Sequence, residues 1–220
     1  MNTSLAKRPR GRPKKTEEQR DDGNRRQALI CAAAQLFKLK GYDATTTREI
    51  AAQIGMQPGS PFYHFENKQD LLLAVMVDGM KRAIADQHTL LKALLTQSPK
   101  ANASIKLRIL IRHHFEVLLG PQSDFIPVML YESRALNSVQ RLSINKLKDS
   151  YEAAWIPVLQ ELCHCNKLKA PVGISRLMIF GALNWSVQWY EAPLIKNKNR
   201  VKSHHASLDE LTEAALVLFL

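Results

Sequence analysis

The chain has 220 residues, of which 45% are hydrophobic and 23% are charged, and its formal net charge at pH 7 is +11. This composition is ordinary for a soluble protein with a sizeable core. It excludes a membrane-spanning protein, because no stretch reaches the roughly 18 uninterrupted apolar residues of a span. The basic start also lacks the apolar segment of a signal peptide, so we expect a cytoplasmic protein.

A basic arm is expected over residues 1–22. The stretch KRPRGRPKK, residues 7–15, contains six cations, two prolines and one glycine and no carboxylate, so it cannot build a core. Residues 1–26 hold nine Lys/Arg against four acidic residues, the densest positive charge in the chain. The arm is either a solvated tail or a binder of a polyanion, and the segments that follow decide between them.

The first two helices of the chain have clear sequence signals. From 25 to 40 the apolar residues recur at the spacing of one helical face, and Gly41 follows as a candidate C-cap. Thr46 stands three residues before Glu49, which is the spacing of a capping box. This pair predicts the start of a second helix that Gly55 ends.

A third helix is predicted to begin at Pro58, since a proline is tolerated at the first helical position. Gly59 and Pro61 confine this helix, and Asn67 is the expected N-cap of the next one. Three helices within residues 23–68, the last two joined by a few residues, indicate a helix-turn-helix.

We call this helix-turn-helix, residues 23–68, the head. Longer helical patterns follow it and predict an all-α protein with a larger helical body over residues 69–220. They are separated by Pro- and Gly-containing breaks and cover residues 68–95, 104–119, 125–136, 142–165, 172–191 and 207–220. The last two are the most apolar, so each must be buried within the protomer or against a partner.

Residues 28–72 resemble the DNA-binding domain of the tetracycline-repressor (TetR) family. The matching pieces are Ala-x-x-Leu-Phe-x-x-x-Gly-Tyr, Thr-Thr-x-x-Ile-Ala (46–51), Ile-Gly-Met (54–56) and Gly-Ser-x-Phe-Tyr-His-Phe-x-x-Lys (59–68). The resemblance implies a homodimeric bacterial transcription regulator, usually a repressor, that binds a palindromic double-stranded DNA operator and is released by a small-molecule effector. It also implies that the third helix enters the major groove.

The DNA contacts of the family carry over to ten positions in the head. They fall on Thr47, Arg48, Gln57, Pro58, Gly59, Ser60, Phe62, Tyr63, His64 and Lys68. Arg48 and Lys68 are cations at helix starts, where the helix dipole disfavours them, and a nearby phosphate would explain both. Pro61 departs from the family, which usually has Leu or Ile there, and it predicts a later start or a shifted angle of the third helix.

The predicted helix-turn-helix favours a DNA-binding role for the arm over a solvated tail. Within it, PRGRP matches an AT-hook, in which Arg10 and Arg12 would enter a narrow A·T minor groove and the glycine would let the backbone approach the groove floor. Placed ahead of a reading head, such an arm extends the footprint on DNA.

The body is expected to bind the effector and a second protomer. Candidate ligand-binding residues are Arg112, His113, Phe115, Tyr131 and Trp155. The C-terminal part resembles regulators of fatty-acid or sterol-chain breakdown, whose effectors are acyl-CoA esters. The candidate dimer interface follows helical spacing on the last two helices, unless both stripes pack within one protomer: Leu177, Gly181, Asn184, Trp185, Gln188, Leu211, Ala215, Leu218 and Phe219.

Other functions have weaker signals. Cys163 and Cys165 are two residues apart and would point to different sides of a helix, so a shared metal ion or a thiol sensor is disfavoured. Together with Cys31 they make an odd count of three, which argues for reduced thiols in a cytoplasm and against a disulfide framework. No catalytic motif appears, and we expect no enzyme, metal or cofactor. The alternative from another class is an architectural protein that binds AT-rich DNA without an effector.

Overall fold

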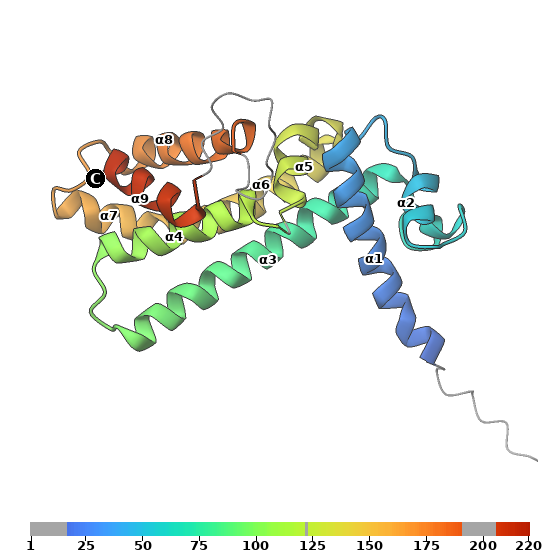
Figure 1. The fold of residues 1–220 in the computed structure, drawn as a ribbon, viewed down its shortest axis with the longest axis horizontal. Helices are drawn as coiled ribbons and strands as arrows, with labels where there is room; N and C mark the ends of the chain where they lie inside the picture. The colour runs from blue at the N-terminus through green and yellow to red at the C-terminus, as the bar shows by residue number, and fades with distance from the viewer. Residues whose placement is uncertain (1–16, 122, 191–205) are drawn as a thin grey trace, which may run out of the picture.

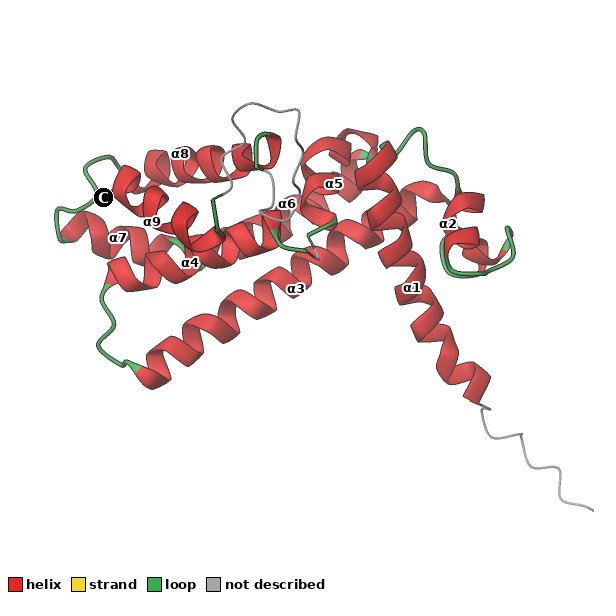
Figure 2. Ribbon diagram, viewed as in Figure 1, coloured by secondary structure: helices red, strands yellow, loops and turns green. Residues whose placement is uncertain are grey.

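The computed structural model describes residues 17–121, 123–190 and 206–220, and all regular structure in these ranges is helical (Figure 2). The all-α prediction is therefore confirmed. Residues 1–16 of the predicted arm, with Arg10 and Arg12, lie outside the described residues, whereas residues 17–22 belong to the first helix. The elements are α1 (Glu17–Lys40), α2 (Thr47–Gln53), η1 (Ser60–Tyr63), α3 (Lys68–Gln97), α4 (Ala103–Leu119), α5 (Phe125–Glu132), η2 (Ser133–Ala135), α6 (Ser138–Ala153), α7 (Ile156–His164), α8 (Val172–Trp185), η3 (Ser186–Gln188) and α9 (Leu208–Phe219).

Helix α3 connects the two parts of the molecule. Figure 1 shows α1 and α2 at one end, the body with α4 and α7 to α9 at the other, and α3 running from the head along the body. Helices α8 and α9 both pack on α4, while α5 packs on α1 and on α3. A change in the body can therefore reach the head through α3 and through α5.

The head is held by the local signals that the sequence contains. Gly41 and Gly55 have φ of +83° and +69°, conformations that glycine adopts without strain, and each ends a helix. The capping box predicted for Thr46 and Glu49 is confirmed at the start of α2. Asn67 caps α3 by accepting from the Asp70 backbone N–H. These caps fix the angles at which α1, α2 and α3 meet.

The predicted third helix is only a single 3-10 turn, η1. Pro61 is buried at its second position and has no N–H to donate to the carbonyl of Gln57. That carbonyl accepts from Ser60 instead (N···O 2.9 Å), which is 3-10 and not α-helical bonding. The departure of Pro61 from the family pattern thus shortens this segment to one turn.

Several predicted helix boundaries are wrong, and proline explains the clearest case. The pattern over 142–165 is two helices, α6 and α7, because Pro157 cannot continue a helix and instead occupies the first turn of α7. Helix α1 begins at Glu17, earlier than the predicted residue 25. The segments 125–136 and 172–191 each end in a 3-10 turn, η2 and η3.

The joint between head and body is closely packed. A side-chain Cβ placed on Gly79 of α3 would lie only 2.0 Å from Cγ of Phe125, the first residue of α5. Next to it, Lys38 of α1 donates to the carboxylate of Asp124 at 3.0 Å. The start of α5 is therefore held between α1 and α3.

Candidate nucleic-acid interface and effector pocket

Most residues predicted to contact DNA lie at the surface of the head. Tyr63 is 91% exposed and Phe62 is 55% exposed, although both are large aromatic residues. Four other predicted contact residues are exposed and three are half-buried: Arg48, Gln57, Pro58 and Gly59, then Thr47, Ser60 and His64. Aromatic rings left in water at the end of a domain are typical of a contact surface.

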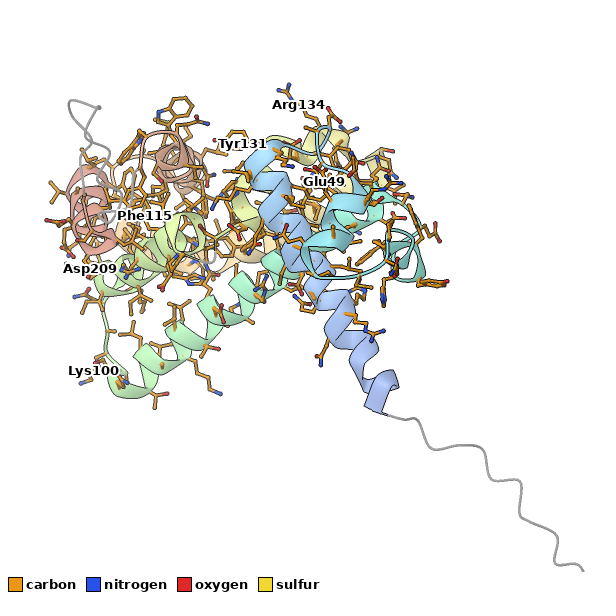
Figure 3. The ribbon with its side chains drawn as sticks, turned by 45° about the vertical axis from the view of Figure 1, so that its right-hand side comes forward. Glu49, Lys100, Phe115, Tyr131, Arg134 and Asp209 are labelled. Carbon is orange, nitrogen blue, oxygen red and sulfur yellow. The ribbon has the colours of Figure 1, made fainter. Side chains whose placement is uncertain are left out.

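Among the described residues around α2, Arg48 is a cation available to an external partner. The Glu49 carboxylate accepts from Lys40 (2.8 Å) and from Thr46, and these hydrogen bonds lower the pKa of Glu49 to about 2. Figure 3 shows Glu49 at the head end of the molecule. Arg48 forms no hydrogen bond or ion pair with any residue in the described ranges. Its guanidinium can therefore pair with an external anion such as a phosphate.

Lys68 occupies a structural position within the head. Its ammonium donates to the carbonyls of Tyr42 (2.8 Å) and Thr45 (3.0 Å), and it lies 4.2 Å from the centre of the Tyr42 ring. The start of α3 is thereby tied to the loop between α1 and α2. Contact of Lys68 with a DNA phosphate stays a prediction.

Lys68→Ala is expected to lower the free energy of unfolding of the head by about 2 kcal/mol. The substitution removes the charged donor that the carbonyls of Tyr42, Asp43 and Thr45 now share. Denaturant unfolding followed by circular dichroism measures the effect. Lys81→Ala is the matched control, because Lys81 is exposed on the same helix. Equal stability of the two variants would contradict the structural role of Lys68.

The body contains a partly open cavity of about 160 Å³. Its walls are mostly apolar, and five helices contribute to them. The lining residues are Met80 and Ala83 from α3, His114 from α4, Ile126, Met129 and Leu130 from α5, Lys148, Tyr151 and Glu152 from α6, and Phe180 and Asn184 from α8. An apolar cavity with a few polar groups is the usual form of a small-molecule site.

A buried hydrogen-bond chain runs along one wall of this cavity. The Nε2–H of His114 donates to Oδ1 of Asn184 (3.1 Å), and the Tyr151 hydroxyl donates to His114 Nδ1 (3.1 Å). Burial lowers the pKa of His114 to about 4, so its imidazole is neutral at physiological pH. The Tyr151–His114–Asn184 hydrogen bonds therefore form a polar but uncharged network, and this network fixes the orientation of the Asn184 amide.

None of the five predicted ligand-binding residues lines this cavity. Arg112 pairs with Asp209 (2.6 Å), which lies beside α4 (Figure 3), and Phe115 is buried in the core. The Tyr131 side chain is 48% exposed, and its hydroxyl accepts from Gln188. Trp155 is fully buried behind the cavity wall, with its ring 4.8 Å from that of Phe180.

The histidine of the cavity is His114 and not the predicted His113. His113 points to the other side of α4, where its Nε2–H donates to the Ala83 carbonyl (3.0 Å) and burial lowers its pKa. The sequence contains the missed signal. His114 follows Leu107, Leu110 and Ile111 at spacings of seven, four and three, so it continues the buried stripe of α4.

A larger hollow of about 580 Å³ lies between α3 and α4. Its lining includes the charged or ionisable residues Arg82, Asp86, His113 and Glu116. This hollow is the more open of the two, whereas five helices surround the smaller cavity. The smaller cavity is therefore the better candidate for an effector site.

The outer side of α8 and α9 carries an apolar surface, which we call the α8–α9 surface. It consists of side chains that are 57% to 83% exposed: Ile174, Leu177, Met178, Trp185, Val217 and Leu218. Gly181 is exposed among them, and a Cβ there would meet nothing within 4 Å. Exposed apolar side chains gathered in this way are typical of a protein–protein interface.

The other residues predicted for the dimer interface are less available to a partner. Ala215 is buried within the protomer, and Asn184 points inward to His114. Leu211 and Phe219 are half-buried against the core, while exposed Gln188 bonds to Tyr131. The exposed part of the prediction is thus Leu177, Gly181, Trp185 and Leu218, together with Gln188.

The described part of the chain contains no candidate metal site. No group of three or more His, Cys, Asp or Glu side chains there could hold a metal ion. Cys31, Cys163 and Cys165 are all free thiols. No helix among the described residues is long and apolar enough to cross a membrane.

Comparison with known proteins identifies the family. Residues 29–75 match the family of bacterial regulatory proteins called tetR, and residues 100–206 match the tetracyclin repressor-like C-terminal domain. The HTH-type transcriptional repressor KstR2 of Rhodococcus jostii (strain RHA1) is 34% identical over 182 residues, which are 81% of this chain and 85% of the relative. The chain belongs to the TetR family.

Two further comparisons concern a fatty-acid regulator. The fatty acid metabolism regulator protein of Bacillus subtilis (strain 168) is 29% identical to this TetR-family chain over 161 residues, 72% of this chain and 79% of the relative. The crystal structure of the transcriptional regulator FadR from Bacillus subtilis in complex with stearoyl-CoA superposes with a TM-score of 0.66 and 26% identity, covering 87% of this chain and 96% of that one. These relatives are transcription regulators and not enzymes.

Proposed function

We propose that this TetR-family regulator is a homodimeric repressor that binds a palindromic DNA operator and leaves it when a small ligand fills the body cavity. One observation carries the proposal, namely the position of the cavity. Ile126 and Met129 of α5 line it, and the first residue of the same short helix, Phe125, packs on α3. A ligand that displaces α5 would therefore act on the support of the head.

The head surface supports DNA binding. Phe62 and Tyr63 protrude from η1, and Arg48 lies nearby on α2 without a partner among the described residues. A hydroxyl and an aromatic ring can contact base edges and thymine methyl groups, while an arginine can contact phosphate. The predicted AT-hook arm would add minor-groove contacts next to this surface.

The effector class is suggested by the relatives. The Bacillus subtilis regulator that resembles this chain was solved with stearoyl-CoA, a long acyl thioester. The mostly apolar walls of the cavity suit an acyl or similar hydrophobic group. The competing proposal, an architectural protein for AT-rich DNA, requires neither a cavity nor a ligand response.

Tyr63→Ala is expected to weaken operator binding by roughly 10- to 100-fold and to relax preference at particular base pairs. Footprinting of genomic fragments would first locate the operator, and fluorescence anisotropy would then compare it with single-base variants. Tyr131→Ala is the matched control, because Tyr131 is a half-exposed tyrosine on the body. Indifference to sequence, together with no release by an organic extract of the host, would favour the architectural alternative.

A further inference from the structure

The size of the body cavity limits what it can hold. Its volume is about 160 Å³, close to that of engineered cavities of roughly 150 Å³ that bind benzene. A saturated chain of about eighteen carbons has three times as many carbons as benzene and needs roughly three times that space. The cavity thus fits a compact group and not the acyl chain of stearoyl-CoA.

The inner wall offers one directed hydrogen-bond donor. Oδ1 of Asn184 accepts from His114, so the Nδ2 group of Asn184 is the part of its amide that can donate to a ligand. That amide donates to no acceptor within the described ranges, although Asn184 lines the cavity. An oxygen atom of a ligand, such as a carbonyl or carboxylate oxygen, would satisfy it.

A lysine without a counter-ion also lines the cavity. Lys148 of α6 is half-buried, and burial lowers the pKa of its ammonium group. It forms no hydrogen bond or ion pair with a described residue, since the carboxylate of Glu152 one turn later pairs with Arg176. A desolvated ammonium group is stabilised by an anion, so the ligand should carry negative charge.

We propose that the cavity binds a compact anionic ligand, in which an apolar group of about six carbon atoms adjoins an oxygen acceptor. Asn184 would donate to the oxygen, and Lys148 would pair with the negative charge. Free branched or aromatic carboxylic acids have this chemistry, because one carboxylate supplies both the oxygen and the charge. In their CoA thioesters only the carbonyl oxygen lies next to the acyl group, and the negative charges are on phosphates too distant to enter the cavity with it. The assignment as an effector, but not the binding itself, rests on the proposed function.

Calorimetric titration of the full-length protein tests the ligand class. The probes are benzoate and 3-methylbutanoate as free acids, their CoA thioesters, and stearoyl-CoA. We expect the free acids to bind one molecule per protomer and at least tenfold more tightly than stearoyl-CoA. Tighter binding of the thioesters than of the matching acids would contradict the pairing of Lys148 with a charge inside the cavity.

Two variants test the polar contacts. Asn184→Leu and Lys148→Met should each weaken the compact ligand by roughly tenfold or more, because each removes a buried polar contact of the ligand. Lys146→Met is the matched control, since Lys146 is exposed on the same helix and does not line the cavity. Unchanged affinity in both cavity variants overturns the assignment.

A third variant tests the size limit independently. Met129→Ala should enlarge the cavity and shift preference toward longer acids, such as hexanoate, relative to 3-methylbutanoate. Tighter binding of stearoyl-CoA than of every compact probe by the unaltered protein overturns the proposal, as does no binding of any compact probe. If stearoyl-CoA alone releases the operator, the proposed function stands and this inference fails; if a compact probe binds without releasing the operator, the reverse holds.

Discussion

Leu177→Glu combined with Leu218→Glu is expected to yield a folded monomer that binds the operator about 100-fold or more weakly. Both leucines belong to the α8–α9 surface and are 63% and 80% exposed in the protomer, so the new carboxylates remain in water when the chain is alone. In a dimer they would be buried without partners, which is costly. Loss of the second head removes the effective-concentration gain of bivalent binding, about 10²- to 10⁴-fold.

Sedimentation velocity and operator titration measure this effect on the same samples. Leu142→Glu is the matched control, because Leu142 is 61% exposed on α6 and lies outside the α8–α9 surface. Circular dichroism should show the same helix content for all three proteins. A double variant that sediments as a dimer and binds its operator normally would place the protomer interface elsewhere.

Gly79→Ala is expected to lower the free energy of unfolding by about 1–3 kcal/mol. Two effects oppose each other at this position. Alanine is favoured over glycine within a helix by about 1 kcal/mol, but its Cβ would lie 2.0 Å from Cγ of Phe125. Because Cγ is the root of the ring and not a mobile end, the ring and the start of α5 must move. The free-energy cost of this overpacking exceeds the gain in helix propensity.

Thermal and denaturant unfolding measure the loss, and a second substitution identifies its cause. In a Phe125→Leu background the clash is reduced, so Gly79→Ala should cost little or become stabilising there. Gly23→Ala serves as the control, since Gly23 lies within α1 and a Cβ there would meet nothing within 4 Å. An equal loss in the Phe125→Leu background would show that the contact with Phe125 is not responsible.

The contact between Gly79 and Phe125 also bears on the proposed release of the operator by a ligand. Phe125 begins α5, the helix that contributes Ile126 and Met129 to the cavity, and the neighbouring Asp124 pairs with Lys38 of α1. Gly79→Ala would therefore shift an element that packs on the head and also lines the cavity proposed to hold the ligand. We expect this variant to change the ligand concentration needed for operator release more than it changes ligand affinity.

The head was predictable from sequence because its signals are local. The capping box of Thr46 and Glu49, the cap at Asn67 and the positive-φ glycines act within a few residues of each other, so spacing alone reveals them. Proline also acts locally, and Pro157 could have predicted the break between α6 and α7. The exposure of Leu177, Trp185 and Leu218 likewise agrees with the apolar periodicity of the last two helices.

Only the tertiary structure decided which side chains meet in the body. His113 and His114 are neighbours in sequence, but a helix turns by about 100° per residue, so one contacts Ala83 and the other forms the wall of the cavity. Asn184 and Lys68 show the same dependence, because their partners, His114 and the Tyr42 carbonyl, come from other elements of the fold. Sequence periodicity determines that a helix face is buried, whereas the packing of α3, α4, α5, α6 and α8 around one space determines which polar group on that face can bind a ligand.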